Sequence, residues 1–352
     1  MMSSRTRGQL PSKLERALSD PAVGARRFDP DEGVVFTHIP KTSGYSLRGA
    51  LRGAIRAQST LSGFDRVLFG GFEDFNSLSD CTRSEIYLHA ADMPKSVGLV
   101  TGHFSLRMTK TIYPNAQHLT LFREPYTRIL SHWLYWRSQN EGALRAWGRW
   151  SDRLRLARGS LESFLADPRV ACQIDNVSAR MLLWPHSLIP ADGFIDPSAD
   201  DILIEAAVGQ LGGFCYYNIV EDPNLVRSLE AWLERPLGYS TLNQTPSMPP
   251  GLETDLDREL TPRALELMES RSRLDLRLWI FAAQQRHGVT GVRTLRDRAL
   301  LSGGARYSRL ASGETTDAAS FLRLSGAANR VRRVARFFRR AISVPARGGE
   351  KQ

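Results

Sequence analysis

The chain has 352 residues and a formal net charge of +10, a length that allows one large domain or two small ones with a substantial buried core. Residues 291–352 hold 14 basic and 4 acidic residues, and the rest of the chain holds 33 of each. Because the body is neutral, its charge gives no reason to expect a nucleic-acid-binding protein.

The chain has three widely spaced cysteines, which form neither a metal-binding pattern nor an even disulfide set, so we expect a reducing compartment. The N-terminus has no apolar stretch long enough for a signal peptide, and no stretch approaches the length of a membrane span. These features predict a cytoplasmic protein. Residues 1–28 are expected to form a polar leader with a short helix at Ser12–Leu18.

The stretch Val34–Ser46 predicts a strand, a tight turn and the start of a helix. Val34–Phe36 is a β-prone apolar run, and Pro40 ends it because proline has no N–H for a ladder. In Ser46–Arg56, apolar residues recur at the spacing of one helix face. A helix N-terminus presents free N–H groups and a positive dipole end. With Lys41 just before it, the turn is expected to bind phosphate or sulfate.

The turn is not a Walker A loop, because its Lys precedes the Gly and no Gly lies between Val34 and Ser43. The alternative is a surface turn with one solvated lysine. The chain contains only five lysines against 42 arginines. A lysine at this turn in so arginine-rich a chain favours a role that needs a compact, mobile ammonium group and not a planar guanidinium.

Further strands and helices alternate along the chain. Ser59–Asp80 is predicted to be irregular and to line a substrate cleft. The other predicted strands are Ile86–Leu88, Val97–Phe104, His118–Phe122 and Phe214–Val220. The other predicted helices are Tyr126–Trp136, with Pro125 in its first turn, Leu161–Ala166, Gln173–Leu183, Pro223–Glu234 and Thr261–His287.

This alternation predicts an α/β fold with a mostly parallel sheet over residues 29–290. Ligands of such sheets lie at the carboxyl ends of the strands. Lys41 and Arg123 both follow predicted strands directly, so we expect both at that edge.

Residues 291–352 are expected to form a basic tail. Within it, Arg330–Ile342 places apolar residues on one helical stripe with arginines around it. Such an amphipathic helix can lie on an anionic membrane surface, here the inner face. The alternatives are a helix packed on the body and a disordered basic tail.

Two segments resemble the carbohydrate sulfotransferases. HIPKTSGYS at His38–Ser46 is similar to their phosphosulfate loop, and FREPYTRILSHW at Phe122–Trp133 is similar to the R-x-P-x-x-R-x-x-S element that binds the donor's 3′-phosphate. The likeness is to the branch that includes heparan sulfate 2-O-sulfotransferase and its bacterial relatives. With weaker similarities, it covers roughly Gly33–Arg286. It implies a P-loop-like three-layer fold with a central, mostly parallel sheet flanked by helices.

The resemblance implies that the donor is 3′-phosphoadenosine-5′-phosphosulfate (PAPS), with no metal required. Lys41 would neutralise charge on the leaving phosphate, helped by the backbone N–H groups of Thr42, Ser43, Gly44, Tyr45 and Ser46. Arg123 and Ser131 would bind the other anionic end of the donor. Arg128 is expected either to add charge there or to pair with an acid such as Glu124.

His103 is the expected general base, since imidazole has a pKa near neutrality and the related branch carries a catalytic His in a similar Gly-His setting. That branch has another His two residues earlier, where this chain has Thr101. The alternative for His103 is a structural role at a strand end. His38 is expected in the core or behind the site, and His132 is expected to pack.

Two residues depart from the family pattern within the loop. Ser43 replaces a usual Gly, which should be tolerated if its φ is negative. Tyr45 replaces a usual Thr, so its ring either stacks on a substrate or points into the core.

The leading prediction is a PAPS-dependent sulfotransferase acting on a hydroxyl of a carbohydrate or glycolipid. The alternatives are a kinase or other phosphotransferase, and a non-catalytic nucleotide-binding module of the same fold. Five aromatic residues are candidates for a sugar-stacking wall, although helix packing is the favoured explanation for most of them: Trp133, Tyr135, Trp136, Trp147 and Trp150.

Overall fold

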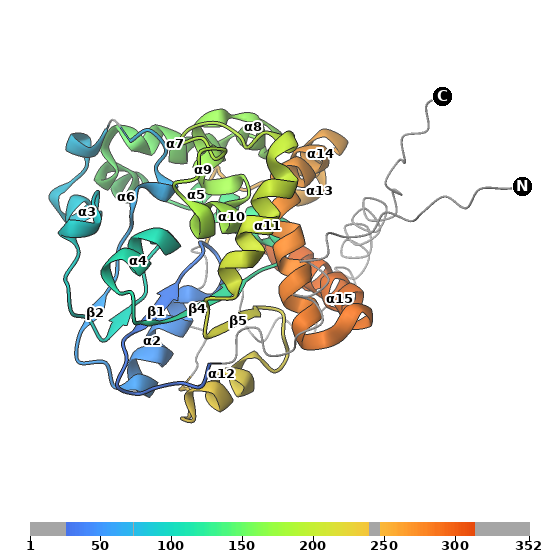
Figure 1. Ribbon diagram of the computed structural model, residues 1–352. Coiled ribbons are helices and arrows are strands. Elements are labelled where there is room, and N and C mark those ends of the chain that lie inside the picture. Colours follow the sequence, from blue (N-terminus) through green and yellow to red (C-terminus); the bar gives the residue numbers. More distant parts are fainter. Residues whose placement is uncertain (1–25, 73, 239–246, 314–352) are drawn as a thin grey trace, which may run out of the picture.

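A computed structural model describes residues 26–72, 74–238 and 247–313, and it has a five-stranded parallel sheet at its centre (Figure 1). The strand order is β2-β3-β1-β4-β5. The strands are β1 (Val34–Thr37), β2 (Thr60–Leu61), β3 (Leu99–Val100), β4 (Gln117–Phe122) and β5 (Tyr216–Ile219). β1 and β4 are buried at every position, as expected for central strands of a parallel sheet covered on both faces.

Helices cover both faces of the sheet, which confirms the predicted α/β three-layer fold. Alternate residues of β1 point to opposite faces. Phe36 packs with α2 (Gly44–Ile55) and α12 (Leu225–Leu233) on one face, whereas Val35 packs with residues around α4 (Leu106–Ile112) on the other. The second face is also covered by α10 (Val177–Leu183), α11 (Asp200–Leu211) and the first part of α15 (Arg273–Ala311).

A further apolar core lies among helices beyond the sheet, in the upper part of Figure 1. It is built around α5 (Pro125–Arg137), whose N1 position is Pro125 as predicted. The surrounding helices are α6 (Glu141–Ala146), α7 (Ser151–Arg155), α8 (Leu161–Ala166), α9 (Ala171–Ile174), α13 (Leu256–Glu259) and α14 (Pro262–Ser270). The segment Ser59–Asp80, predicted to be irregular, contains the two-residue strand β2, and the short α3 (Asp80–Ser84) begins at its last residue.

Two predicted strands are corrected. Ile86–Leu88 is not a strand, and only Ile86 forms an isolated bridge, to Phe64. The predicted strand Val97–Phe104 is reduced to Leu99–Val100. The chain then comes so close to Gly63 that a Cβ on Gly102 would lie 2.5 Å from the Gly63 carbonyl oxygen. Glycine is required there, and regular pairing stops.

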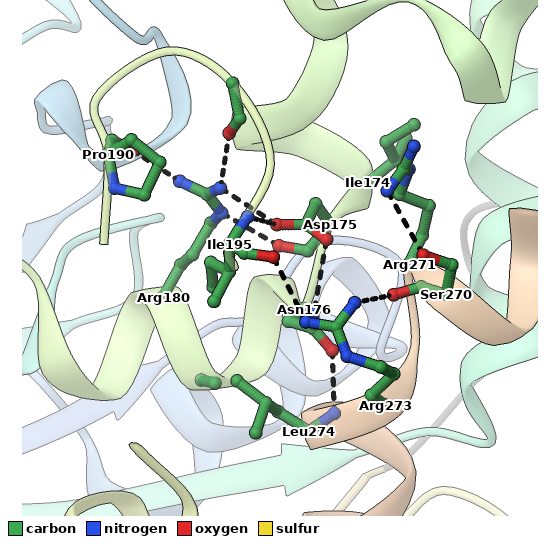
Figure 2. A network of polar contacts seen from close by, with 12 residues as sticks. Ile174, Asp175, Asn176, Arg180, Pro190, Ile195, Ser270, Arg271, Arg273 and Leu274 are labelled. Atoms are coloured by element: carbon green, nitrogen blue, oxygen red, sulfur yellow. Dashed lines mark hydrogen bonds and ion pairs between the residues drawn. The ribbon is translucent and has the colours of Figure 1, made fainter. Parts of the chain in front are cut away.

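The predicted helix Gln173–Leu183 is broken between α9 and α10, where Asn176 has φ 47°. Figure 2 shows the buried network that holds this break. The Asp175 carboxylate accepts hydrogen bonds from Arg180 and from the Ile195 N–H, and the Asn176 amide oxygen accepts one from the Leu274 N–H. These side chains offer the backbone alternatives to helical hydrogen bonds.

The predicted helix Thr261–His287 is two helices, α14 and α15. α15 bends at Gly288 (φ 63°, ψ 173°) and continues to Ala311, so the expected start of the tail at residue 291 falls inside it. Its second part packs against α5, where a Cβ on Gly303 would lie 2.7 Å from a Thr127 methyl group. The predicted helices Ser12–Leu18 and Arg330–Ile342 lie outside the described residues. In the described part of the chain, no helix has the length and apolar character to span a membrane.

Candidate functional site

A cavity of about 330 Å³ lies beyond the ends of β1 and β4. Its walls come from the β1–α2 turn, the segment after β3, α5, the segment around Trp147 and the second part of α15. Six of the predicted site residues line it: Lys41, Ser43, Ser46, His103, Arg123 and Ser131. The two segments predicted to bind anions and the predicted base therefore lie around one cavity.

The remaining predicted site residues belong to the turn itself. Thr42 is buried, and its hydroxyl donates a 2.7 Å hydrogen bond to the Ile39 carbonyl, which closes the turn. Gly44 and Tyr45 begin α2. The side chain of Tyr45 lies outside what the structure describes, so the predictions about its ring stay predictions.

The turn has an unusual backbone, with φ of 69° at Lys41 and 62° at Ser43. The expectation of a negative φ at Ser43 is therefore wrong, because Ser43 occupies the left-handed region that favours the glycine usual in the resembled family. Ser43 precedes α2 without capping it through its side chain, and the first turn of α2 contains no acidic residue. The N-terminus of α2 thus keeps its positive end open to an anion.

Among the described residues, three cationic side chains line the cavity, Lys41, Arg123 and Arg306, and no carboxylate does. The Arg123 guanidinium donates to the Lys41 carbonyl at 2.9 Å and to the Tyr307 hydroxyl. The ammonium group of Lys41 lies 4.0 Å from the centre of the Tyr135 ring. Burial, followed by the charges of Arg123 and Arg306, lowers the pKa of Lys41 to about 7. An anion bound beside Lys41 would favour its charged form and raise this pKa.

His103 is held in a defined tautomer. Its Nδ1 lies 2.6 Å from the His38 carbonyl oxygen, and its backbone N–H donates to the Gly63 carbonyl at 2.8 Å. Because a carbonyl oxygen only accepts, the hydrogen of the neutral ring is on Nδ1 and the free lone pair is on Nε2. Burial is the main cause that lowers the pKa of His103 to about 4, so the ring is neutral at pH 7 and can accept a proton.

The other two histidines of the site also line the cavity. The His38 ring lies 4.2 Å from the His103 ring, and burial lowers the pKa of His38 well below its usual value. The buried His132 ring packs 4.6 Å from the Trp136 ring. His132 packs as the sequence predicted, whereas His38 is half-buried and lines the cavity, so its expected place in the core or behind the site is wrong.

Arg128 is not part of the site. Its guanidinium is buried 3.8 Å from the Asp275 carboxylate, and it donates to the Ile174 carbonyl at 3.1 Å. The expected partner Glu124 instead accepts from the Thr127 N–H at the start of α5 and lies 3.5 Å from Arg296. The second arginine of the R-x-P-x-x-R pattern thus joins α5 to α15.

Arg306 and Tyr307 are the site residues that the sequence reasoning missed. They lie in a segment that was assigned to the tail because Gly, Ser, Ala and Arg dominate its composition. The aromatic cavity residues Phe64 and Phe69 were placed only within an irregular segment expected to line a cleft.

The described residues contain no group of three or more His, Cys, Asp or Glu side chains able to hold a metal ion. Comparison with protein-family models and with curated proteins finds no match to this chain.

Proposed function

We propose that the protein is a sulfotransferase that moves the sulfuryl group of PAPS to a hydroxyl of a carbohydrate or glycolipid. The observation that carries this proposal is the cavity in which three cations without a carboxylate stand beside a neutral histidine with a free Nε2 lone pair. A donor with anionic groups at both ends of a nucleoside matches this excess of positive charge. The cavity volume is at the lower end of the range for small-molecule sites.

In the proposed reaction, the acceptor oxygen attacks the sulfur, and the bond between the sulfur and the phosphate oxygen breaks in line. The acceptor proton passes to Nε2 of His103. Lys41 and the N-terminal N–H groups of α2 stabilise the negative charge that develops on the leaving phosphate oxygen. Arg123 and Ser131 hold the 3′-phosphate, and the hydrogen bond from Arg123 to the Lys41 carbonyl fixes the distance between the two anion sites.

Calorimetric titration with 3′-phosphoadenosine-5′-phosphate (PAP) tests the donor site. The wild type should bind PAP, and Lys41→Ala and Arg123→Ala should each weaken binding tenfold to hundredfold, about the value of a charge-assisted hydrogen bond. The exposed residues Lys95 and Arg107 provide matched controls, and their replacement by alanine should leave binding unchanged. No binding by the wild type, or binding that survives both site substitutions, would refute the proposal.

A transfer assay then separates the alternatives. Transfer of the ³⁵S-labelled sulfuryl group from PAPS supports the enzyme, whereas PAP binding without transfer to any acceptor supports a non-catalytic module. Transfer of phosphate from ATP in the presence of Mg²⁺ would support a phosphotransferase instead.

A further inference from the structure

The cavity has an aromatic region as well as a cationic one. Three half-buried rings, Phe64, Tyr135 and Trp147, line it. Two buried rings, Phe69 and Trp150, also line it: the Phe69 ring lies 6.1 Å from that of Trp147 and 5.3 Å from that of Trp150. These contacts form a rigid wall of π faces and ring edges that carries no charge.

The contacts between side chains divide the cavity lining into a cationic group and an aromatic group. The cations are joined to one another, because Arg123 bonds to the Lys41 carbonyl and Arg306 lies close enough to Lys41 to lower its pKa. The aromatic rings are joined through Phe64, whose ring lies 6.1 Å from Trp147.

Two residues stand at the junction of these regions. The His103 ring lies 5.3 Å from the Phe64 ring, and the Tyr135 ring lies 4.0 Å from the Lys41 ammonium. A molecule that fills the aromatic region therefore presents its edge to His103 and to the anion held by Lys41.

We propose that the aromatic region binds the acceptor and selects an uncharged molecule with a flat apolar face. This inference rests on the sulfuryl transfer proposed above. Among the described residues, the cations that line the cavity are the three that the proposed function assigns to the donor, so a carboxylate or sulfate against Phe64 and Trp147 would have no cation left to pair with. A flat apolar face instead gains dispersion and ring-packing energy there. Two sources share this chemistry, the C–H face of a neutral sugar ring and the ring of an aromatic alcohol.

Three probes separate charge from ring type. Methyl β-D-glucopyranoside and methyl β-D-glucopyranosiduronic acid differ only at C6, which is a hydroxymethyl group in the first and a carboxylate in the second. The third probe, 2-naphthol, is an aromatic alcohol. Each is titrated calorimetrically into the full-length protein saturated with PAP, so that the measurement does not depend on turnover. We expect the glucoside to bind at least about tenfold more tightly than the glucuronide, in line with the cost of burying an unpaired charge. Whichever of the glucoside and 2-naphthol binds more tightly identifies the source, a neutral sugar ring or an aromatic alcohol.

Variants of Trp147 test the wall itself. Trp147→Ala should weaken the better neutral probe by about tenfold, Trp147→Phe should restore most of that loss, and PAP affinity should change less than about twofold in both. Trp232→Ala, which changes a tryptophan packed on Phe28 at the opposite end of the fold, serves as the control.

Tighter binding of the glucuronide, no binding of either neutral probe, or unchanged affinity in Trp147→Ala would overturn this inference. Failure of PAP to bind would count against the proposed function instead. The same titrations without PAP would then still decide whether the aromatic region prefers the uncharged ring.

Discussion

The guanidinium of Arg123 donates a 2.9 Å hydrogen bond to the backbone carbonyl of Lys41. The two residues follow neighbouring parallel strands, β1 and β4, and are 82 positions apart in the chain. This bond joins the two segments proposed to bind the anionic ends of the donor, because a shift of either strand end would move both cations. It also holds Lys41 in its left-handed backbone conformation.

The lowered pKa of Lys41 predicts proton uptake on ligand binding. In the free protein this pKa is about 7, so at about pH 8 most Lys41 is neutral. A bound phosphate favours the ammonium form and raises the pKa, so PAP binding should take up close to one proton. Calorimetry in buffers with different ionisation enthalpies measures this uptake. Lys41→Arg should bind PAP without it, since arginine stays charged; equal uptake in the variant would assign the proton to another group.

The two perturbed groups predict a bell-shaped pH profile for kcat/KM of the donor. His103 must be neutral to accept a proton, and its pKa is about 4, so activity falls below that pH. Lys41 must be charged, and its pKa is about 7, so activity falls above that pH. His103→Ala should lower transfer by about 10²–10⁴-fold and retain PAP binding. Loss of PAP binding would mean that His103 has a structural role.

Arg306 should contribute to donor binding although it lies 265 positions after Lys41. Its charge acts on Lys41, and its side chain lines the cavity. We expect Arg306→Ala to weaken PAP binding about tenfold, as for one charge-assisted hydrogen bond. Arg293 is exposed on the same helix, and Arg293→Ala should leave affinity unchanged. Equal losses in both variants would indicate a general effect of charge.

Arg128 should matter for stability and not for binding. Arg128→Met leaves the buried carboxylate of Asp275 without its charge partner, which should cost about 3–5 kcal/mol of unfolding free energy. Adding Asp275→Asn should recover part of this loss, because it removes the unpaired buried charge, although the single amide oxygen can accept from only one of the Ser178 and Ala179 N–H groups, which donate to different carboxylate oxygens. Denaturant titration measures both variants. A large fall in the PAP affinity of folded Arg128→Met would instead place Arg128 in the site.

Ser43→Gly should stabilise the fold. A left-handed residue other than glycine costs about 1–2 kcal/mol, and glycine returns about 0.5–1 kcal/mol of this through its greater unfolded-state entropy. The expected net gain is about 0.5–1 kcal/mol in unfolding free energy. Ser43→Ala retains the strained φ and should show no gain, and equal stability of Ser43→Gly and Ser43→Ala would contradict the backbone explanation.

The parts of the fold that the sequence predicted are those that local patterns determine. The run Val34–Phe36 forms a strand because it is apolar throughout, and Leu161–Ala166 forms α8 with Ser160 as its cap. The missed features depend on distant partners. Asn176 breaks a helix because its amide accepts from Leu274, 98 positions away. The partner of Arg128 is Asp275 and not the nearby Glu124 because the packing of α15 on α5 brings them together.

The site residues also divide into those that local sequence patterns indicate and those that depend on distant contacts. Lys41 and Arg123 follow predicted strands, so the carboxyl-edge rule for parallel sheets placed them at one edge, whereas His103 was chosen for the chemistry of imidazole and by the family resemblance. Arg306 reaches the cavity and Tyr307 reaches Arg123 because the second part of α15 packs on α5, where Gly303 leaves room for a close approach. Nothing in their own neighbourhood in the sequence indicates that contact.

The course of α15 has a consequence for the order in which the protein is made. All five strands precede residue 220, so the sheet and the Lys41 turn can form while the chain is still on the ribosome. Arg306 and Tyr307 emerge some ninety residues later, and the cationic cluster is complete only when the second part of α15 has docked on α5. A nascent chain that stops at Gly288 would contain the whole sheet but would lack Arg306 and Tyr307 of the cationic cluster.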